Sequence, residues 1–537
     1  MDLKYSFPSR RSAVMSNRGM VATSQPLATQ VGVSILQQGG NAIDAAIATA
    51  AALNVVEPMM TGIGGDAFAL VYLSRSKELK ALNASGRAPY ATSVETLRNL
   101  GYQKMPETGI HSVTIPGALD GWCVLLDKYG RISLSQVLAP AIGLAEHGFP
   151  VTGIVAHRWQ ESQVKLQANV NAASTYLIGG RAPESSEVFV QSELADTFKK
   201  IARGGRDVFY RGSIAEAIVA CSQENGGLIA MPDLNDHAST WVTPISTNYR
   251  GYDVYECPPN GQGLVALLAL NILEGYDLKS LGHNSAEYLH LLIEALKLAF
   301  ADAYRYVADP DFVVIPLERL LSKSYAERRR KLIDKNRASQ KVMAGVPGTE
   351  GDTVYLAVTD KEGNSVSFIN SLYQSFGSGI VVRGTGICLQ NRGALFSLEP
   401  GHPNCLEPHK RPYHTIILGM VFKDGDLFLT FGVMGGFMQP QGHVQILLNI
   451  IDFGMDVQTA LDAPRFRYIQ GNECAFEPGF PPEVLQKLAG KGHRVVALDD
   501  PYSQQFGGAQ AIMIDPKSKV LIAGSDPRKD GCAIGLW

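Results

Sequence analysis

Gly351-Asp352-Thr353-Val354-Tyr355 is the pentapeptide at which the character of the chain changes. The residues that lead up to Thr353, 336–352 (NRASQKVMAGVPGTEGD), contain a proline and three glycines, which is typical of an exposed loop. Residues 354–358 (VYLAV) form a short apolar run, and a turn at 361–364 leads into a second run, SVSFINS. The pattern predicts a buried pair of strands that follows an exposed loop, with Thr353 at the junction.

Thr353 has the placement that an N-terminal nucleophile needs. If the precursor is cut between Asp352 and Thr353, the new α-amine can serve as base for the hydroxyl of the same residue. A free α-amine titrates near ~7.7–8.0, so it can accept a proton at neutral pH without a histidine. An ordinary threonine at the start of a strand would give the same pattern, so the motif alone leaves both interpretations open.

Composition indicates a globular protein without a charged partner. The 537 residues include 48 basic and 51 acidic side chains, a balance that disfavours nucleic acid or an anionic membrane as partner. The length exceeds one ordinary domain, yet no linker-like break divides the chain. Seven cysteines are scattered singly with no CxxC pair, which is typical of reduced thiols in a cytoplasmic protein. The first residues lack an apolar h-region, so we expect no secretory signal.

Hydrophobic periodicity predicts several further elements. The first two-thirds of the chain is expected to be helix-rich and the last third strand-rich. Residues 42–60 are almost wholly apolar, but they contain an aspartate, a glutamate and a proline, so we expect a buried helix rather than a membrane span. Other predicted elements are helices at 135–147, 285–307 and 443–453 and a strand at 427–431.

Metal or cofactor chemistry is disfavoured. Prolines interrupt the segment that contains His402, Cys405, His409 and His414, and its spacing matches no standard zinc site. Gly62-Ile63-Gly64-Gly65-Asp66 lacks the third glycine of a dinucleotide-binding loop and follows a helical pattern. His290 falls within a predicted amphipathic helix and is expected to be a packed or surface histidine. We therefore expect neither a metal nor a cofactor.

Eight segments between residues 39 and 531 carry a stronger signal. In chain order they are GGNAIDAAIATAAALNVVEP (39–58), TGIGGD (61–66), TIPGALDGW (114–122), DTVYLAVTDKEGNSVS (352–367), FGSGIVV (376–382), GVMGG (432–436), DAPRF (462–466) and GSDPRKDG (524–531). Together they resemble the γ-glutamyltransferase (glutathione hydrolase) family of autoprocessing N-terminal-nucleophile (Ntn) hydrolases, and the resemblance covers nearly the whole chain.

The resemblance implies an α+β fold, a four-layer αββα Ntn-hydrolase sandwich built from two cleavage products. Residues 1–352 would form a large subunit that ends in a maturation loop at about 336–352, and residues 353–537 a small subunit. The two products would stay associated as a heterodimer, alone or as a pair of heterodimers. Asp352 and Thr353 would flank the cleavage site, with Thr353 as the nucleophile.

The resemblance also assigns the groups around the nucleophile. Gly435 and Gly436 correspond to the glycine pair that forms the oxyanion hole, where one donor is worth roughly 2.7–4 kcal/mol. Ser371 corresponds to a hydroxyl residue that hydrogen-bonds the nucleophile. Tyr373 stands where the transpeptidases of the family typically have asparagine, so the shape of the pocket is expected to differ.

The substrate-binding end departs further from the family. Ser85 replaces the arginine that binds the γ-glutamyl α-carboxylate. Arg87, two residues later, is expected to bind an anionic acyl group together with Arg392. Leu395 replaces the carboxylate that holds the α-amino group, and Arg392 replaces its polar neighbour. The paired serines of the family are replaced by His414 and Thr415. A cationic amine would therefore meet a guanidinium and lose its anionic partner.

We therefore expect an N-terminal-threonine amidohydrolase that works through an acyl-enzyme and favours hydrolysis over transpeptidation. The expected substrates are small-molecule amides, either γ-glutamyl (glutathione-like) or with a related carboxylate-bearing acyl group. The alternatives are an oxamate amidohydrolase or a cephalosporin (glutaryl) acylase. An unprocessed pseudoenzyme that acts as a scaffold belongs to a different class, and intact Thr353, Ser371, Gly435 and Gly436 disfavour it.

Overall fold

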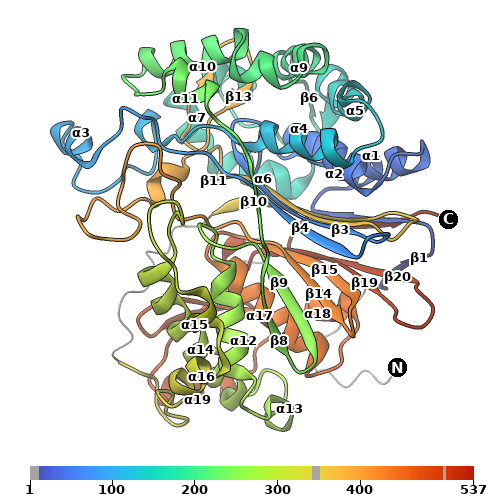
Figure 1. Ribbon diagram of the computed structural model, residues 1–537, viewed down its shortest axis with the longest axis vertical. Helices are drawn as coiled ribbons and strands as arrows, with labels where there is room; N and C mark the ends of the chain where they lie inside the picture. Colours follow the sequence, from blue (N-terminus) through green and yellow to red (C-terminus); the bar gives the residue numbers. More distant parts are fainter. Residues whose placement is uncertain (1–10, 341–350, 500–502) are drawn as a thin grey trace.

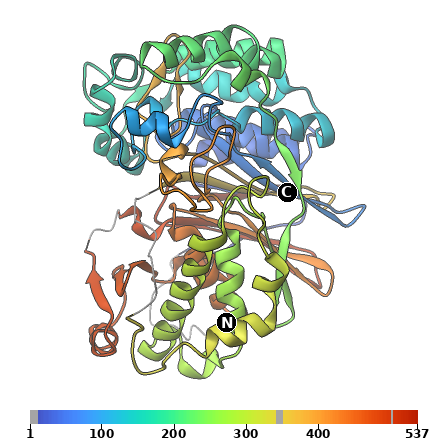
Figure 2. The same cartoon turned by 60° about the vertical axis from the view of Figure 1, so that its left-hand side comes forward.

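Two seven-stranded sheets lie face to face between two layers of helices in the computed structural model, which describes residues 11–340, 351–499 and 503–537 (Figure 1). All strand pairs within these two sheets are antiparallel. Figure 2 shows the same order of layers after a turn of 60°. The predicted four-layer αββα sandwich is confirmed.

The first sheet contains the strand that starts at the Asp352–Thr353 junction. Its strands, in spatial order, are β21 (Cys532–Gly535), β2 (Met20–Thr23), β10 (Asp352–Thr359), β11 (Ser365–Tyr373), β3 (Asp66–Leu73), β4 (Glu78–Ala84) and β7 (Thr240–Val242). The helices that pack on it are α1 (Pro26–Gln37), α2 (Ala42–Val56) and α4 (Ala118–Tyr129). Helices α5 (Leu134–His147), α9 (Ser192–Tyr210) and α10 (Ser213–Glu224) pack outside these helices and belong to the same core.

The second sheet lies beneath the first in Figure 1. Its strands, in spatial order, are β1 (Val14–Ser16), β20 (Leu521–Ser525), β19 (Gly508–Ile514), β15 (Asp426–Met434), β14 (Gly419–Lys423), β9 (Tyr252–Glu256) and β8 (Ile245–Tyr249). The helices that cover its outer face are α12 (Gly263–Leu273), α17 (Met438–Ile451) and α18 (Val457–Asp462), and α14 (Ala286–Tyr306) packs on α12.

Shorter elements complete the described chain. The helices are α3 (Val94–Asn99), η1 (Ile110–Ser112), α6 (Gly153–Glu161), α7 (Gln163–Gln167), α8 (Val170–Tyr176), α11 (Met231–Asn235), α13 (Leu278–Leu281), α15 (Leu317–Leu321), α16 (Lys323–Arg330), η2 (Arg392–Leu395), α19 (Pro482–Gly490) and η3 (Gln504–Phe506). The small sheets pair β5 (Phe149–Pro150) with β6 (Val188–Phe189), β12 (Val381–Val382) with β13 (Ile387–Cys388), and β16 (Phe466–Gln470) with β17 (Glu473–Phe476) and β18 (Arg494–Ala497).

Strand β10 is buried on both faces because it lies inside both the helical core and the core between the sheets. Val354, Leu356 and Val358 belong to the cluster beneath the upper helices, whereas Tyr355 and Ala357 pack between the sheets. Alternate side chains of a strand point to opposite faces, so five apolar residues in a row suit this central position. Thr353 is the second residue of this buried strand.

Most elements predicted from periodicity are confirmed. Helices α5 and α14 agree with the predicted limits to within one residue, and α2 begins at the predicted residue and ends four residues earlier. Helix α2 is buried along its whole length. Helix α17 begins at Met438, earlier than the predicted 443, because Pro440 lies in the first turn, where a missing N–H costs little. Residues 341–350 of the predicted maturation loop lie outside the described residues.

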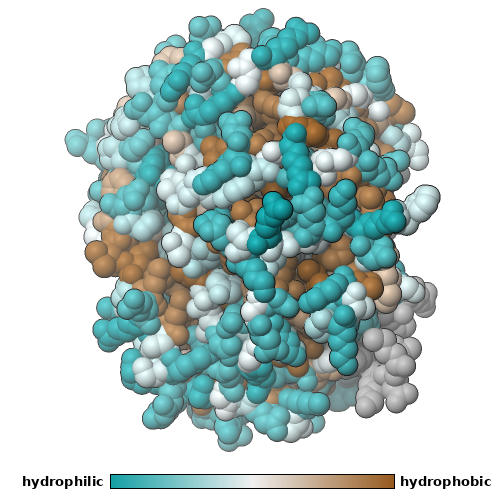
Figure 3. Space-filling model, turned by 45° about the vertical axis from the view of Figure 1, so that its right-hand side comes forward, coloured by the Kyte–Doolittle hydropathy of each residue, from teal (hydrophilic) through white to brown (hydrophobic). Residues whose placement is uncertain are grey.

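The surface of the face shown in Figure 3 is mostly hydrophilic, with apolar side chains in separate patches. Among the described helices, none combines the length and the apolar character that crossing a bilayer requires. All seven cysteines are free, and most are buried.

Candidate active site

The chain runs without a break through Asp352 and Thr353, so the structure is that of the uncleaved protein. Segments far apart in the sequence meet at this junction. They are the start of β10, the end of β11 with Ser371 and Tyr373, the turn at Gly435-Gly436 between β15 and α17, and helix η2 with Arg392. The structure therefore brings together most of the residues that the sequence assigned to catalysis and substrate binding.

Ser371 connects the hydroxyl of Thr353 with the preceding peptide group. Its Oγ lies 3.1 Å from Thr353 Oγ1 and 2.8 Å from the carbonyl oxygen of Asp352. A carbonyl can only accept, so Ser371 donates its one proton to Asp352. The Thr353 hydroxyl thus lies beside a carbonyl group that already accepts a hydrogen bond.

Two donors hold Ser371 in this orientation. Arg392 Nη2 donates to Ser371 Oγ at 3.0 Å, and the backbone N–H of Tyr373 donates to it at 2.8 Å. These bonds occupy both lone pairs of the hydroxyl and direct its proton toward Asp352. Tyr373 has a φ of 80°, an unusual value for a bulky residue, and such backbone strain costs on the order of 1–3 kcal/mol. The strained turn directs the Tyr373 N–H at Ser371.

Arg392 is a buried cation that contacts Ser371, the residue next to the Thr353 hydroxyl. Its Nη1 donates to Thr415 Oγ1 at 2.6 Å, and its guanidinium lies over the Tyr373 ring, 4.6 Å from the centroid. Its buried Nε has no hydrogen-bond partner among the described residues. Burial lowers the pKa of Arg392 to about 10, while the carboxylate of Asp66 opposes this shift. The side chain therefore stays charged at neutral pH and keeps unused N–H donors.

Asp66 and His414 form a buried pair near Arg392. His414 Nε2 lies 3.1 Å from the Asp66 carboxylate, and His414 Nδ1 accepts the backbone N–H of Ile416. The proton of the ring therefore sits on Nε2 and is donated to Asp66. Burial lowers the pKa of His414 far below its usual value, so the ring is neutral. Burial also raises the pKa of Asp66 to about 6, with Arg392 acting in the opposite direction.

Gly435 and Gly436 adopt φ values of 117° and 59°, which favour glycine. Gln262 fixes this turn, since its Nε2 donates to the carbonyl of Gly436 at 2.9 Å and to that of Thr415 at 2.6 Å. The backbone of Gly351 packs on the turn: a Cβ placed on Gly436 would lie 3.0 Å from the Cα and N of Gly351. Gly351 therefore covers Gly436 in the uncleaved chain.

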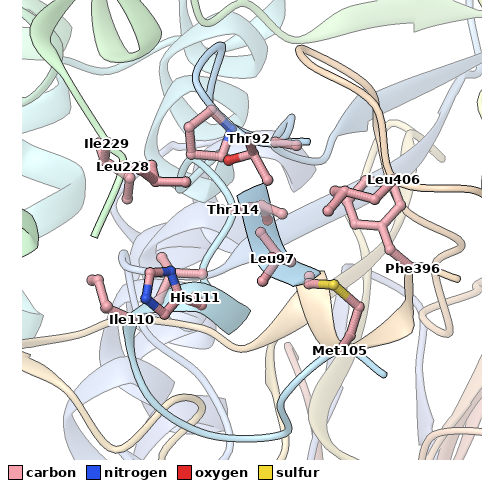
Figure 4. Close-up of a pocket in the computed structure, with 14 residues that line it drawn as sticks. Thr92, Leu97, Met105, Ile110, His111, Thr114, Leu228, Ile229, Phe396 and Leu406 are labelled. Carbon is pink, nitrogen blue, oxygen red and sulfur yellow. The ribbon is translucent and has the colours of Figure 1, made fainter. Parts of the chain in front are cut away.

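The site is closed to solvent. Thr353 is 1% exposed, and Ser371 and Arg392 are 0% exposed. A small apolar cavity next to η2 has a volume of about 10 Å³, enough for one water molecule, and its walls include Leu97, Met105 and Phe396 (Figure 4). Thr353 is therefore out of reach of a substrate in the uncleaved chain.

Arg87 belongs to a different cluster. Its guanidinium pairs with Asp309 at 3.1 Å and with Asp311 at 2.8 Å, and it also donates to the carbonyl of His409. The structure does not bring Arg87 together with Thr353 and Arg392. Its guanidinium already forms ion pairs with two carboxylates. Its contribution to substrate binding stays a prediction.

Three site residues were not found by sequence reasoning. Gln439 Nε2 lies 3.5 Å from Thr353 Oγ1, and its Oε1 accepts the N–H of Ile417. Gln262 donates a hydrogen bond to the carbonyl of Gly436, and the Asp66 carboxylate accepts one from His414. The sequence motif TGIGGD (61–66) contains Asp66, but no role was predicted for it. The signal that could have identified it is a carboxylate within a glycine-rich apolar segment. No local pattern marks the two glutamines, whose partners are distant in the sequence.

Histidines and acidic groups have partners other than a metal in the described structure. His414 pairs with Asp66, His409 stacks on Tyr90 at 4.4 Å, and His402 contacts Tyr304. One further group, His290, Glu294 and His493, has distances that a metal could bridge. However, His290 and His493 hydrogen-bond to each other at 2.8 Å, and Lys297 and the N–H of Ser339 bind the oxygens of Glu294. His290 is a packed histidine, as predicted.

A four-layer sandwich with a threonine at the start of an inner strand is the architecture of the Ntn hydrolases, and solved structures of that class match this chain. The family model described as Gamma-glutamyltranspeptidase matches residues 28–536, and the chain belongs to this family. It is therefore an enzyme of a family that hydrolyses or transfers amide-linked acyl groups.

Two relatives and one solved structure that are similar to this chain have names that indicate different activities. The chain is 42% identical to the glutathione hydrolase-like YwrD proenzyme of Bacillus subtilis, covering 98% of this chain and 99% of the relative. It is 34% identical to the oxamate amidohydrolase proenzyme of Klebsiella pneumoniae, covering 98% and 99%. The crystal structure of cephalosporin acylase from Bacillus halodurans matches with a TM-score of 0.93 and 46% identity, covering 100% of this chain and 99% of that one.

Proposed function

We propose that the chain is a precursor that cleaves itself between Asp352 and Thr353 and then hydrolyses amides of small carboxylate-bearing acyl groups. The observation that carries the proposal is the placement of Thr353 Oγ1 and the Asp352 carbonyl around one hydroxyl, Ser371 Oγ. Substrate amides would use the same nucleophile after the cleavage.

This geometry supports the following route of cleavage. Thr353 Oγ1 attacks the carbonyl carbon of Asp352, and its proton passes to the nitrogen of Thr353 as the C–N bond breaks. The product is an ester between Asp352 and the Thr353 hydroxyl. Water hydrolyses this ester, which leaves a carboxylate on Asp352 and a free α-amine on Thr353. The amine then acts as the base for substrate amides.

The sheet order supports a stable pair of products, residues 1–352 and 353–537. Strand β10 from the small subunit lies between β2 of the large subunit and β11, and β11 in turn pairs with β3 of the large subunit. Separation would break these strand ladders and expose both apolar cores. We therefore propose that the products remain a heterodimer. The seven free thiols support the cytoplasmic location expected from the sequence.

Ser371→Ala should slow self-cleavage by about 10²–10³-fold, because the Asp352 carbonyl loses the donor that stabilises its developing negative charge. The measurement is the cleaved fraction over time by intact mass after cell-free synthesis. Ser371→Thr is the matched control, since it keeps the hydroxyl and should still cleave. Wild-type kinetics in Ser371→Ala would contradict the assigned role of the hydroxyl.

The pocket chemistry supports an acyl group that bears a carboxylate and no amine. Arg392 is a cation with unused N–H donors, and Leu395 in the same short helix offers no carboxylate for an ammonium group. The names of the cephalosporin acylase and oxamate amidohydrolase relatives agree with this interpretation. γ-Glutamyl amides remain the alternative, because other relatives are named glutathione hydrolases. We propose that water is the preferred acceptor.

A pair of substrates tests this proposal directly. Glutaryl p-nitroanilide and γ-glutamyl p-nitroanilide differ only in the α-amino group, and the wild-type enzyme should prefer the glutaryl compound. Arg392→Gln combined with Leu395→Asp should shift the preference toward the γ-glutamyl compound. A lost buried charge pair costs ~3–5 kcal/mol, which corresponds to about two to four orders of magnitude in relative kcat/KM.

The comparison is made on cleaved protein, since Arg392 also supports Ser371. Leu395→Asp alone is the control that leaves this support intact, and it should shift the preference in the same direction. Oxamate and glutathione, each with and without glycylglycine, complete the substrate panel. Equal turnover of both anilides by the wild-type enzyme would contradict the proposed acyl specificity.

A further inference from the structure

The side-chain amide of Gln262 uses both of its N–H groups and its oxygen in hydrogen bonds. Gln262 lies directly before α12 and is 0% exposed. Its Nε2 donates to the carbonyl oxygen of Thr415 at 2.6 Å and to that of Gly436 at 2.9 Å. Its Oε1 accepts a hydrogen bond from the hydroxyl of Tyr413 at 3.0 Å. Carbonyl oxygens only accept, so the NH₂ group of the amide must face Thr415 and Gly436.

The two carbonyl groups belong to parts of the candidate site that have different tasks. Gly436 is one of the two glycines of the proposed oxyanion hole. The side chain of Thr415 accepts a hydrogen bond from Arg392 Nη1 at 2.6 Å, and Arg392 is the cation proposed to bind the carboxylate of the acyl group. A single amide group therefore bridges the oxyanion turn and the residue that holds the proposed acyl-binding cation.

The backbone holds Gln262 against the same segment of the chain. The N–H of Gln262 donates to the carbonyl of His414 at 3.0 Å, and the N–H of His414 donates to the carbonyl of Asn260 at 2.9 Å. Gly261 and His414 form an isolated parallel bridge between these two bonds. The amide of Gln262 therefore starts from a backbone position that is fixed relative to Thr415.

We propose that Gln262 is a positioning residue that fixes the distance between the oxyanion turn and the Arg392 guanidinium. The inference rests on the proposed function, which assigns the acyl carbonyl to Gly435 and Gly436 and the acyl carboxylate to Arg392. A substrate that binds Arg392 through its carboxylate places its scissile carbonyl correctly only if these two sites lie at a matching distance. A misplacement of about 1 Å can cost about 10²-fold in rate.

Gln262 acts across the two proposed subunits. It belongs to residues 1–352, whereas Thr415, Gly436 and Arg392 belong to residues 353–537. The hydrogen bonds of its amide do not involve Asp352 or Thr353, so they do not depend on the peptide bond that is cut. The proposed heterodimer therefore keeps this bridge, and the small subunit by itself lacks it.

Gln262→Met tests the proposal on cleaved enzyme with two substrates. Methionine is unbranched and fills the space, but it cannot donate to the two carbonyl groups. Glutaryl p-nitroanilide has a terminal carboxylate, and pentanoyl p-nitroanilide has a methyl group in its place. The kcat for the pentanoyl compound should fall by about 10- to 100-fold with a smaller change in KM, because the oxyanion turn shifts. The ratio of kcat/KM for the glutaryl compound to that for the pentanoyl compound should also fall, by about tenfold, because Arg392 shifts as well.

A double-mutant cycle with Thr415→Val tests whether Gln262 reaches Arg392 through Thr415. Valine has a similar shape but lacks the hydroxyl that accepts from Arg392, so the glutaryl-to-pentanoyl ratio should fall by about tenfold. The ratio in the double variant should be no lower than in the more affected single variant, because both changes weaken the same contact. Effects on the ratio that multiply would overturn the proposed bridge.

Gln445→Met is the matched control for the loss of a buried glutamine. The Nε2 of Gln445 also donates to two backbone carbonyls, those of Gln441 at 3.1 Å and Phe466 at 3.0 Å. This variant should keep the wild-type kcat and the wild-type ratio. If Gln262→Met does not fold or cleave, Tyr413→Phe decides the question, since it removes only the donor to Gln262 Oε1. Tyr413→Phe should then show both losses, each of about 3- to 10-fold.

The two readouts together decide the proposal. A lower kcat with an unchanged ratio would mean that Gln262 supports the oxyanion turn alone, and a lower ratio with an unchanged kcat would mean that it supports Arg392 alone. Either result would overturn the proposal, and so would wild-type values for both. A wild-type protein that does not cleave, or that does not prefer the glutaryl compound, would instead refute the proposed function, so the two failures are distinguishable.

Discussion

Thr353→Ala should remain a single full-length chain and should lose amide hydrolysis by about six orders of magnitude, as expected when a catalytic nucleophile is removed. The alanine lacks the hydroxyl that attacks the Asp352 carbonyl, so no α-amine is released at residue 353. Gly351 then continues to cover Gly436, and the site stays closed. The measurements are intact mass and hydrolysis of glutaryl p-nitroanilide.

Thr353→Ser is the matched control for this loss. It keeps a hydroxyl at the same position and should cleave, at a lower rate, to give an active enzyme. Because Thr353 is buried, the variant also tests whether the methyl group matters for packing. Activity of Thr353→Ala comparable with that of wild type would show that another residue is the nucleophile.

Gly436→Val should lower kcat of the cleaved enzyme by about 10²–10³-fold and change KM much less, because the strained backbone would move one proposed oxyanion N–H out of position in the transition state. The backbone at Gly436 has a φ of 59°, which valine adopts only with strain. The new side chain would also press on Gly351 in the uncleaved chain. We therefore expect slower self-cleavage as well, and kcat must be expressed per cleaved molecule.

Gly471→Val provides the control for backbone strain alone. Gly471 has a similar φ of 54°, and a Cβ there would contact nothing within 4 Å. This variant should cleave and hydrolyse normally. If Gly436→Val had the same kcat as wild type, Gly435 and Gly436 would be an ordinary turn rather than an oxyanion hole.

The fold could be predicted because its signals are local or belong to long motifs. The apolar run after Thr353, the buried α2 and the amphipathic α14 each follow from periodicity. Helix α17 was placed too late because Pro440 and Gly442 are typical of a loop when only the sequence is known. The position of Pro440 in the first helical turn, which resolves the conflict, becomes visible only in the structure.

The site was predicted less completely, since its contacts join distant segments. Sequence motifs identified Thr353 and the two glycines, but the hydrogen bonds that Arg392 makes with Ser371 and Thr415 depend on how η2 packs. Arg87 was chosen for its spacing, and the structure pairs it with acidic residues more than 220 positions away. Such long-range pairing leaves no mark in local sequence.

The proposed self-cleavage is the central claim, and intact mass of the purified wild-type protein under denaturing conditions tests it most directly. The account predicts two masses, corresponding to residues 1–352 and 353–537, with Thr353 as the first residue of the smaller product. A single full-length mass, with no fragment that begins at Thr353, would contradict the account and favour an unprocessed scaffold.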